Sequence, residues 1–228
     1  MIICTSQNEV HFFSKILSIP RNILQITGFS RHDKLEPKVP SPGKIKILIF
    51  PSCDSEVSRH LRHKNTRKAK NSTYFTQWNA LVQYLSLEND IEITLAPHPH
   101  MRGLFSDIHI ENVSLKKECT SYQTYIQNCD ILITDFSSVS WDFAYLNKLT
   151  IFFNYGQIPI FSLSQIQEFG CGPIASTPEQ VSFAVKKISL GNPKYVDRLQ
   201  RAFCYRDKLN SQRTWKQIET LLRRINSI

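Results

Sequence analysis

The strongest chemical signal in this sequence lies in residues 130–146. An apolar run typical of a buried strand leads into a polar turn, residues 134–138, which contains Asp135, Ser137 and Ser138 and which we call the serine turn. Helical spacing of apolar side chains then begins at Val139. Such a turn aims free backbone N–H groups and hydroxyls at one point, which suits an anion such as phosphate. The same residues are ordinary helix caps. Taken alone, the segment leaves phosphate binding and capping as equal alternatives, and Asp135 could also orient a sugar hydroxyl or act as a base.

A histidine in a rigid turn is the second candidate. Pro97 and Pro99 flank His98 shortly after the apolar run 91–95, and proline restricts both its own backbone and that of the preceding residue. Such an imidazole can hydrogen-bond a phosphate oxygen or transfer a proton near neutral pH. In isolation His98 is better explained as an incidental loop residue, but a position beside the serine turn favours a functional one.

Polar segments follow three expected strands. Residues 51–54 follow the apolar run 44–50, residues 97–100 follow 91–95, and the serine turn follows 131–133. In parallel sheets, ligands bind beyond the carboxyl ends of the strands. We therefore expect one ligand site at this edge, built from all three segments.

The alternation of strands and helices that must position these segments indicates an α/β fold. Strands separated by helices of roughly 10–15 residues predict βαβ units, and hence a Rossmann-like parallel sheet with flanking helices. The basic stretch 59–70 lacks apolar periodicity, so we expect a mobile surface loop there. The expected strands are 23–27, 44–50, 91–95, 108–110, 131–133 and 150–153, and the expected helices are 8–17, 73–87, 122–128, 139–146, 178–189 and 213–225.

Four further residues carry weaker signals. Gly28 allows a tight turn after the strand 23–27, and Arg31 could pair either with a phosphate or with Asp33. The residues leave these two pairings equal. Asp142 lies one turn beyond the start of the helix that follows the serine turn, where bracing of that turn is the better explanation.

Composition indicates a folded chain with a basic surface. The 228 residues are 41% hydrophobic and 21% charged, with a net charge of +9. We expect no transmembrane helix and no signal peptide, and the six scattered cysteines favour reduced thiols in a cytosolic compartment. The sequence contains no metal-ligand spacing, Walker motif or serine-hydrolase elbow.

The positive charge gathers in residues 59–70 and 194–224. Such surfaces attract anionic lipid or phosphorylated substrates, and a solvated face without a partner is the alternative. No nucleic-acid partner is expected, because aromatic and basic residues do not interleave as in RNA-binding proteins. The amphipathic helix 213–225 either contacts an anionic membrane surface or packs its apolar side on the domain.

Several short motifs follow one another along the chain in a recognisable order. They are Cys4-Thr5-Ser6 before a helix, the segment 27–35, the pair His98-Pro99, and Thr134-Asp135-Phe136-Ser137-Ser138-Val139 with Asp142-Phe143-Ala144-Tyr145-Leu146. Over nearly the whole chain this order resembles the C-terminal half of the CDP-glycerol glycerophosphotransferase family, whose members build teichoic acids and glycerol-phosphate capsular polymers. The segment 27–35 is similar to the family's Thr-Gly-x-Pro-Arg-x-Asp-x-Leu, and the serine turn is the most specific match.

The resemblance implies a GT-B-type fold with two Rossmann-like lobes and the active site between them. Residues 1–36 would be the end of the N-terminal lobe and the inter-lobe connection, and residues 37–228 the C-terminal nucleotide-binding lobe. The implied donor substrate is CDP-glycerol, without cofactor or metal, and the implied acceptor is a lipid-linked polyol phosphate or glycan. The implied location is the cytoplasm, at the inner face of the cell membrane.

The resemblance also assigns roles to single residues. An acceptor hydroxyl would attack the β-phosphate of CDP-glycerol and release CMP, and protonated His98, the expected catalytic residue, would neutralise charge on the leaving phosphate. The remaining residues would bind the substrate (Arg31, Asp135, Ser137, Ser138) or support the structure (Gly28, Asp33, Asp142).

The sequence departs from the family pattern at three places. Family members carry an upstream Trp-His-Gly-Thr segment with the expected general base, and this sequence contains none. Ser30 stands where the family has proline, and Asn154 stands where an acidic residue is frequent. Two alternatives follow: a catalytically inactive lobe that binds nucleotide or a partner such as a separate N-terminal lobe, and a GT-B glycosyltransferase that uses a nucleotide-sugar.

Overall fold

The chain forms two compact units in the computed structural model. One unit combines Met1–Glu36 with Val196–Ile228, and the other is Pro37–Tyr195. The structure describes residues 1–37, 43–52, 54–116, 121–156, 160–188 and 193–225. Cys53 and most of the proline-rich stretch 37–42 therefore lie outside the described residues. The sequence predicts a single lobe over 37–228, whereas the segment from Val196 onward packs with the first 36 residues; the assignment of the units to lobes of an enzyme stays a prediction.

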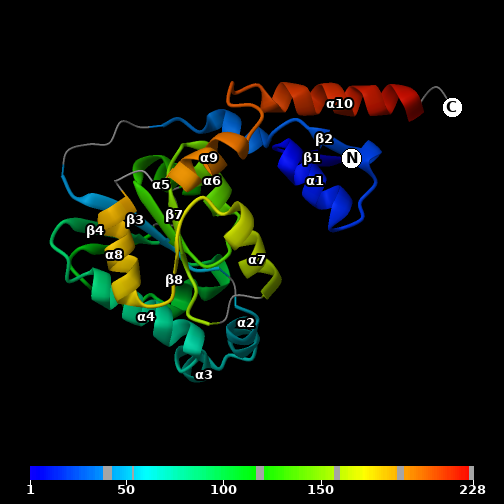
Figure 1. Ribbon diagram of the computed structural model, residues 1–228. Coiled ribbons are helices and arrows are strands. Elements are labelled where there is room, and N and C mark those ends of the chain that lie inside the picture. The colour runs from blue at the N-terminus through cyan, green and yellow to red at the C-terminus, as the bar shows by residue number, and fades with distance from the viewer. Residues whose placement is uncertain (38–42, 53, 117–120, 157–159, 189–192, 226–228) are drawn as a thin grey trace. The chain divides into compact units, whose positions relative to one another are not determined.

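The larger unit is built on a six-stranded parallel sheet (Figure 1), as the α/β prediction requires. The central strands are rich in buried apolar residues, typical of parallel sheets covered on both faces, and Ile47, Leu48 and Ile49 of β3 are fully buried. The strand order is β5-β4-β3-β6-β7-β8. The bounds are β3 Ile45–Phe50, β4 Ile91–Leu95, β5 Val113–Leu115, β6 Ile131–Thr134, β7 Thr150–Phe153 and β8 Ile174–Ala175.

Helices cover both faces of this sheet (Figure 1). Trp78 on α4 and Val181 on α8 belong to the same buried cluster as Ile47 and Ile49 of β3. On the opposite face, Tyr122 of α5 packs edge-on against Phe50, because successive side chains of a strand point to opposite faces. The helices of this unit are α2 Ser55–Arg62, α3 Thr66–Lys70, α4 Thr73–Leu85, α5 Tyr122–Asn128, α6 Val139–Tyr145, α7 Ile160–Phe169 and α8 Pro178–Ile188, with a 3-10 helix at Pro99–Leu104. The helix α9, Pro193–Arg201, begins in this unit and ends in the smaller one.

The strand order creates a switch point between β3 and β6. The chain runs outward from β3 through β4 to β5, and then returns to the other side of β3 and continues through β6, β7 and β8. The connections that leave β3 and β6 therefore diverge to opposite sides. In open parallel sheets this divergence opens a crevice at the carboxyl ends of the two strands, where ligands bind.

The expected loop at residues 59–70 is wrong, because α2 and α3 occupy most of this stretch. Asp54 caps α2 by accepting a hydrogen bond from the Val57 N–H at 2.8 Å, and Asn65 caps α3. Val57 and Ala69 are the buried residues of these short helices. One buried side chain per helix is too few to produce a visible apolar period.

The expected strand at residues 108–110 is also wrong, since the strand that pairs with β4 begins at Val113. Ile108 and Ile110 pack against the core from a loop instead. An alternating apolar pattern indicates that side chains are buried, but it does not by itself show that the backbone pairs with a neighbouring strand. The sequence did not predict β1, β8, α7 or α9, whereas the other expected helices and strands are confirmed with shifts of at most three residues at their ends.

The smaller unit contains a parallel pair of strands, β1 Ile2–Cys4 and β2 Leu24–Ile26, connected through α1 Gln7–Lys15. The C-terminal helix α10, Asn210–Ile225, belongs to the same unit. Several of its apolar side chains are exposed, with Trp215 60% and Leu222 51% exposed, whereas Ile218 is half-buried. No helix in the described part of the chain is long and apolar enough to cross a membrane.

Candidate functional site

Hydrogen bonds clamp the carboxyl ends of β3 and β6 together at the switch point. The Thr134 hydroxyl donates to the Phe50 carbonyl oxygen at 2.6 Å. The next residue, Asp135, accepts a hydrogen bond from the Ser52 N–H at 3.2 Å. The serine turn is therefore anchored to the loop that follows the central strand.

Asp135 is a buried part of this clamp. Its side chain is 1% exposed, and Oδ1 also accepts the Phe136 N–H at 2.8 Å. Oδ2 is buried without a hydrogen-bond partner. Burial raises the pKa of Asp135 against the hydrogen bonds from Ser52 and Phe136, which lower it. The carboxyl group thus lies beneath the turn rather than at its surface.

The two serines of the turn differ in their hydrogen bonding. Ser137 accepts the Val139 N–H at 3.3 Å, so it caps the start of α6, and its side chain is half-buried. Ser138 occupies the N-cap position but makes no side-chain capping bond, and it is exposed. The Ser138 hydroxyl therefore faces solvent, where a ligand can reach it. Asp142 lies buried in the first turn of the same helix.

His98 is tied to the same place through the backbone. Its N–H donates to the Pro51 carbonyl oxygen at 3.1 Å, at the end of β3. Nδ1 accepts the His100 N–H at 3.4 Å, and the two rings stack with their centroids 5.4 Å apart. With Nδ1 as an acceptor, the neutral imidazole carries its hydrogen on Nε2 and can donate it. Burial and then His100 lower the pKa of His98, which disfavours the protonated form in the ligand-free chain.

Residues 51 and 52, which belong to the first of the three polar segments, connect it to the other two. They bond to the His98 turn on one side and to the serine turn on the other. The structure therefore brings His98, Asp135, Ser137 and Ser138 to one edge of the sheet.

Three further predicted residues lie in the smaller unit. Gly28 has a φ of +76°, and a Cβ there would lie 2.1 Å from Asn210 Oδ1, so glycine is required for two reasons. Asp33 accepts backbone hydrogen bonds from Asn210 at 3.0 Å and Ser211 at 2.7 Å. Burial alone would raise the pKa of Asp33, but these hydrogen bonds outweigh it and lower the pKa. Asp33 therefore caps α10, and the Arg31 guanidinium lies 4.4 Å from the Phe29 ring centroid.

The sequence reading missed two tyrosines beneath the site. The Tyr74 hydroxyl, on α4, donates a hydrogen bond to the Ser52 carbonyl oxygen. Tyr155 follows β7 and packs against Tyr74 with the ring centroids 6.0 Å apart. The rule that polar residues after parallel strands gather at one edge could have found Tyr155, whereas Tyr74 lies within an apolar helix face that carries no such signal.

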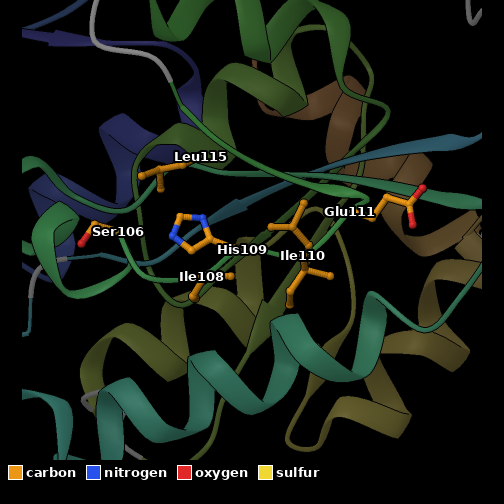
Figure 2. A pocket seen from close by; sticks show the side chains of 7 residues that line it. Ser106, Ile108, His109, Ile110, Glu111 and Leu115 are labelled. Atoms are coloured by element: carbon orange, nitrogen blue, oxygen red, sulfur yellow. The ribbon is translucent and has the colours of Figure 1, made fainter.

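A separate cavity of about 530 Å³ lies along the edge strand β5 (Figure 2). Its lining comes from one short stretch, residues 106–115, and is mostly aliphatic. It lacks the convergence of polar groups from several strands that the switch point has, so we place the candidate site at the switch point. The lining residues are Ser106, Ile108, His109, Ile110, Glu111, Val113 and Leu115.

Comparison with known sequences identifies relatives. A family described as CDP-Glycerol:Poly(glycerophosphate) glycerophosphotransferase matches residues 59–220. The minor teichoic acid biosynthesis protein GgaB of Bacillus subtilis (strain 168) is 32% identical over 215 residues, which is 86% of this chain and 23% of GgaB. The chain thus spans about a quarter of the length of that relative.

Comparison with solved structures shows the fold. A variant of the wall teichoic acid polymerase TagF soaked with CDPG superposes with a TM-score of 0.64 at 17% identity, over 99% of this chain and 58% of that one. A kitacinnamycin glycotransferase gives a TM-score of 0.55 at 13% identity, over 94% and 52%. These likenesses show a GT-B-type fold. Since the sequence match covers most of the chain, the protein belongs to the CDP-glycerol:poly(glycerophosphate) glycerophosphotransferase family.

Proposed function

We propose that this chain binds CDP-glycerol at the switch point and takes part in transferring glycerol phosphate to a hydroxyl of a teichoic-acid or capsular polymer. One observation carries the proposal: in a member of this family, the exposed Ser138 and the His98 turn are both anchored to the carboxyl end of the central strand. Soaking of the structural relative TagF with CDPG supports the choice of ligand.

The groups at this edge suit the pyrophosphate of the donor. The hydroxyls of Ser137 and Ser138 and the Nε2–H of His98 are hydrogen-bond donors that suit phosphate oxygens. In the reaction, an acceptor oxygen bonds to the β-phosphorus, the bond to the CMP oxygen breaks, and the acceptor proton passes to a base. Such transfer depends on in-line positioning and on stabilising charge on the leaving CMP.

His98 would change its protonation state as the donor binds. The pKa of His98 is lowered in the free chain, but an anion at hydrogen-bond distance favours the imidazolium form and raises that pKa. A proton taken up by His98 would then stabilise the leaving phosphate. Arg31 is proposed as a further phosphate ligand on the resemblance alone.

The acceptor is proposed to be lipid-linked, which requires contact with a membrane surface at the cytoplasmic face. The exposed Trp215 and Leu222 on α10 alternate with basic residues such as Lys216 and Arg223. Such a helix binds anionic interfaces through apolar burial and charge together. Sedimentation with vesicles containing phosphatidylglycerol, but not with neutral vesicles, is the expected result, and equal sedimentation with both would exclude this contact.

Calorimetric titration tests donor binding. CDP-glycerol should bind the full chain, UDP-sugars should not, and Ser138→Ala should weaken binding, whereas Ser86→Ala, a solvent-facing serine at the end of α4, should not. Absence of heat with CDP-glycerol would refute the proposal, and preference for a UDP-sugar would favour a nucleotide-sugar glycosyltransferase. Release of CMP upon addition of a polymer acceptor would show catalysis, and binding without release would indicate a donor-binding lobe alone.

A further inference from the structure

The two oxygens of Asp135 have unequal environments. Oδ1 accepts hydrogen bonds from the N–H groups of Ser52 and Phe136 at 3.2 and 2.8 Å. It also lies 3.4 Å from the Thr134 hydroxyl oxygen, whose hydrogen is donated to the Phe50 carbonyl oxygen. Oδ2 is buried and accepts none. Asp135 is 1% exposed, so bulk solvent does not reach its carboxyl group. All the hydrogen bonding of this carboxyl group is therefore made by one atom.

No positive charge compensates this carboxyl group. In the described residues, no lysine or arginine forms an ion pair with Asp135. The titratable groups in this region are Asp54 after β3, Tyr155 after β7, Tyr74 on α4 and His98 after β4. His98 is the one group among them that can carry positive charge, and its lowered pKa disfavours that form in the ligand-free chain. An ionised carboxylate here would leave a charged oxygen buried and unpaired, which is costly.

Protonation on Oδ2 removes that cost without loss of the clamp. Oδ1 keeps its lone pairs and still accepts the N–H groups of Ser52 and Phe136. The Ser52 hydroxyl is also buried without a partner, and it can accept a hydrogen bond from a protonated carboxyl group or donate one to an ionised carboxylate. The burial of the carboxyl group, without an ion pair to a lysine or arginine among the described residues, favours the neutral acid.

The proposed ligand gives the same preference. If the serine turn binds a pyrophosphate, as the proposed function states, an ionised Asp135 directly beneath it would repel that ligand. A neutral carboxylic acid would position the turn through the Phe136 N–H without opposing the anion. Asp135 would then have no need to touch the ligand.

We propose that Asp135 is a neutral carboxylic acid at neutral pH and acts as a positioning residue for the serine turn, not as a ligand of the substrate. Burial raises the pKa of Asp135, in agreement with this assignment. Asparagine has nearly the same shape, keeps the acceptor oxygen and cannot ionise, so Asp135→Asn reproduces the proposed state.

Urea unfolding of the full chain tests the protonation state without any ligand. A carboxyl group whose pKa is raised by folding contributes stability that is present at low pH and is lost as the pH rises. Between pH 5 and pH 7, the unfolding midpoint of the wild type should therefore fall relative to that of Asp135→Asn. A constant difference across this range would overturn the proposal. Asp130→Asn, a change at the opposite end of β6, is the control and should keep the pH dependence of the wild type.

Donor binding tests the positioning role separately. At pH 7 the Asp135→Asn variant should bind CDP-glycerol within about threefold of the wild type. A loss of more than about 30-fold, with an unchanged unfolding midpoint, would show that the carboxylate itself contacts the ligand and would overturn the proposal. If the wild type does not bind CDP-glycerol at all, the proposed function fails, while the unfolding experiment still decides the protonation state.

Discussion

At each end of β6, an aspartate side chain accepts a hydrogen bond from a backbone N–H of β3 or of the loop that follows it, but the two aspartates differ in burial. At the amino end, Asp130 Oδ2 accepts the Lys46 N–H of β3 at 2.8 Å. At the carboxyl end, Asp135 Oδ1 accepts the Ser52 N–H at 3.2 Å. Each aspartate therefore fastens β6 to the central strand. Asp130 is half-buried, whereas Asp135 is 1% exposed.

The difference in burial between Asp130 and Asp135 distinguishes a residue that only joins two strands from one that lies beneath a candidate binding site. Water can replace the partner of Asp130, so that clamp serves the register of two strands and little else. Bulk solvent does not reach Asp135, and the turn above it presents Ser138 to solvent. A buried, hydrogen-bonded residue beneath an exposed turn is an arrangement that holds a binding group in place before the ligand arrives.

The largest expected effect is that of Asp135→Ala. The N–H groups of Ser52 and Phe136 would lose their shared acceptor at a buried position, so the free energy of unfolding should fall by about 3 kcal/mol. Binding of CDP-glycerol should be lost as the serine turn moves. Urea unfolding and calorimetry measure the two effects, and a loss of less than about 1 kcal/mol would contradict the role of the clamp.

Changes to Ser137 and Ser138 should affect donor affinity strongly and the free energy of unfolding only slightly. The double change Ser137→Ala with Ser138→Ala removes the hydroxyls that we propose to bind the anion, and CDP-glycerol should bind roughly 10- to 100-fold more weakly. The free energy of unfolding should change by only about 1 kcal/mol, the contribution of the Ser137 cap. Unchanged affinity would mean that the serines act only as helix residues.

Asp130→Ala provides the matched comparison at the other end of the strand. Only one backbone donor loses its partner, and water can replace it, so we expect a loss of about 1 kcal/mol in the free energy of unfolding. Donor affinity should stay at the wild-type value. Should Asp130→Ala destabilise the chain as much as Asp135→Ala, the contrast between the two ends would be refuted.

The smallest effect concerns His98 and pH. Because folding lowers the pKa of His98, its contribution to stability is present above the ordinary histidine pKa of about 6.5 and is lost as the pH falls through the lowered value. The unfolding midpoint of the wild type should therefore fall relative to that of His98→Gln at acid pH. Parallel midpoints at all pH values would show that burial does not perturb this histidine.

Much of the fold follows from local patterns. The strands β3, β4, β6 and β7 are rich in aliphatic and aromatic residues, and their bounds were predicted within one residue. The helices α2 and α3 escaped prediction because each buries one residue and depends on capping by Asp54 and Asn65. The short strands β1, β5 and β8 were missed or misplaced, since two or three residues carry too little periodicity.

The sequence predicted His98 and the two serines of the candidate site, but it did not predict that Asp135 is buried beneath them. The types and order of His98, Ser137 and Ser138, after strands of one sheet, are enough to indicate an anion site. That Asp135 is buried follows from no local signal, since aspartate after a strand is ordinarily exposed. Its partners Ser52 and Thr134 are fixed only when β3 and β6 become neighbours.

The amino-acid sequence by itself determined the α/β class, most of the strands and the residues at their carboxyl ends, because these depend on apolar periodicity and turn chemistry over short distances. Only the tertiary structure decided the strand order, and with it the switch point that brings residues 51–52 beside the serine turn. It also decided which polar groups are buried. Burial is a property of the packed chain, and it places Asp135 beneath the serine turn, where we propose that it supports the turn.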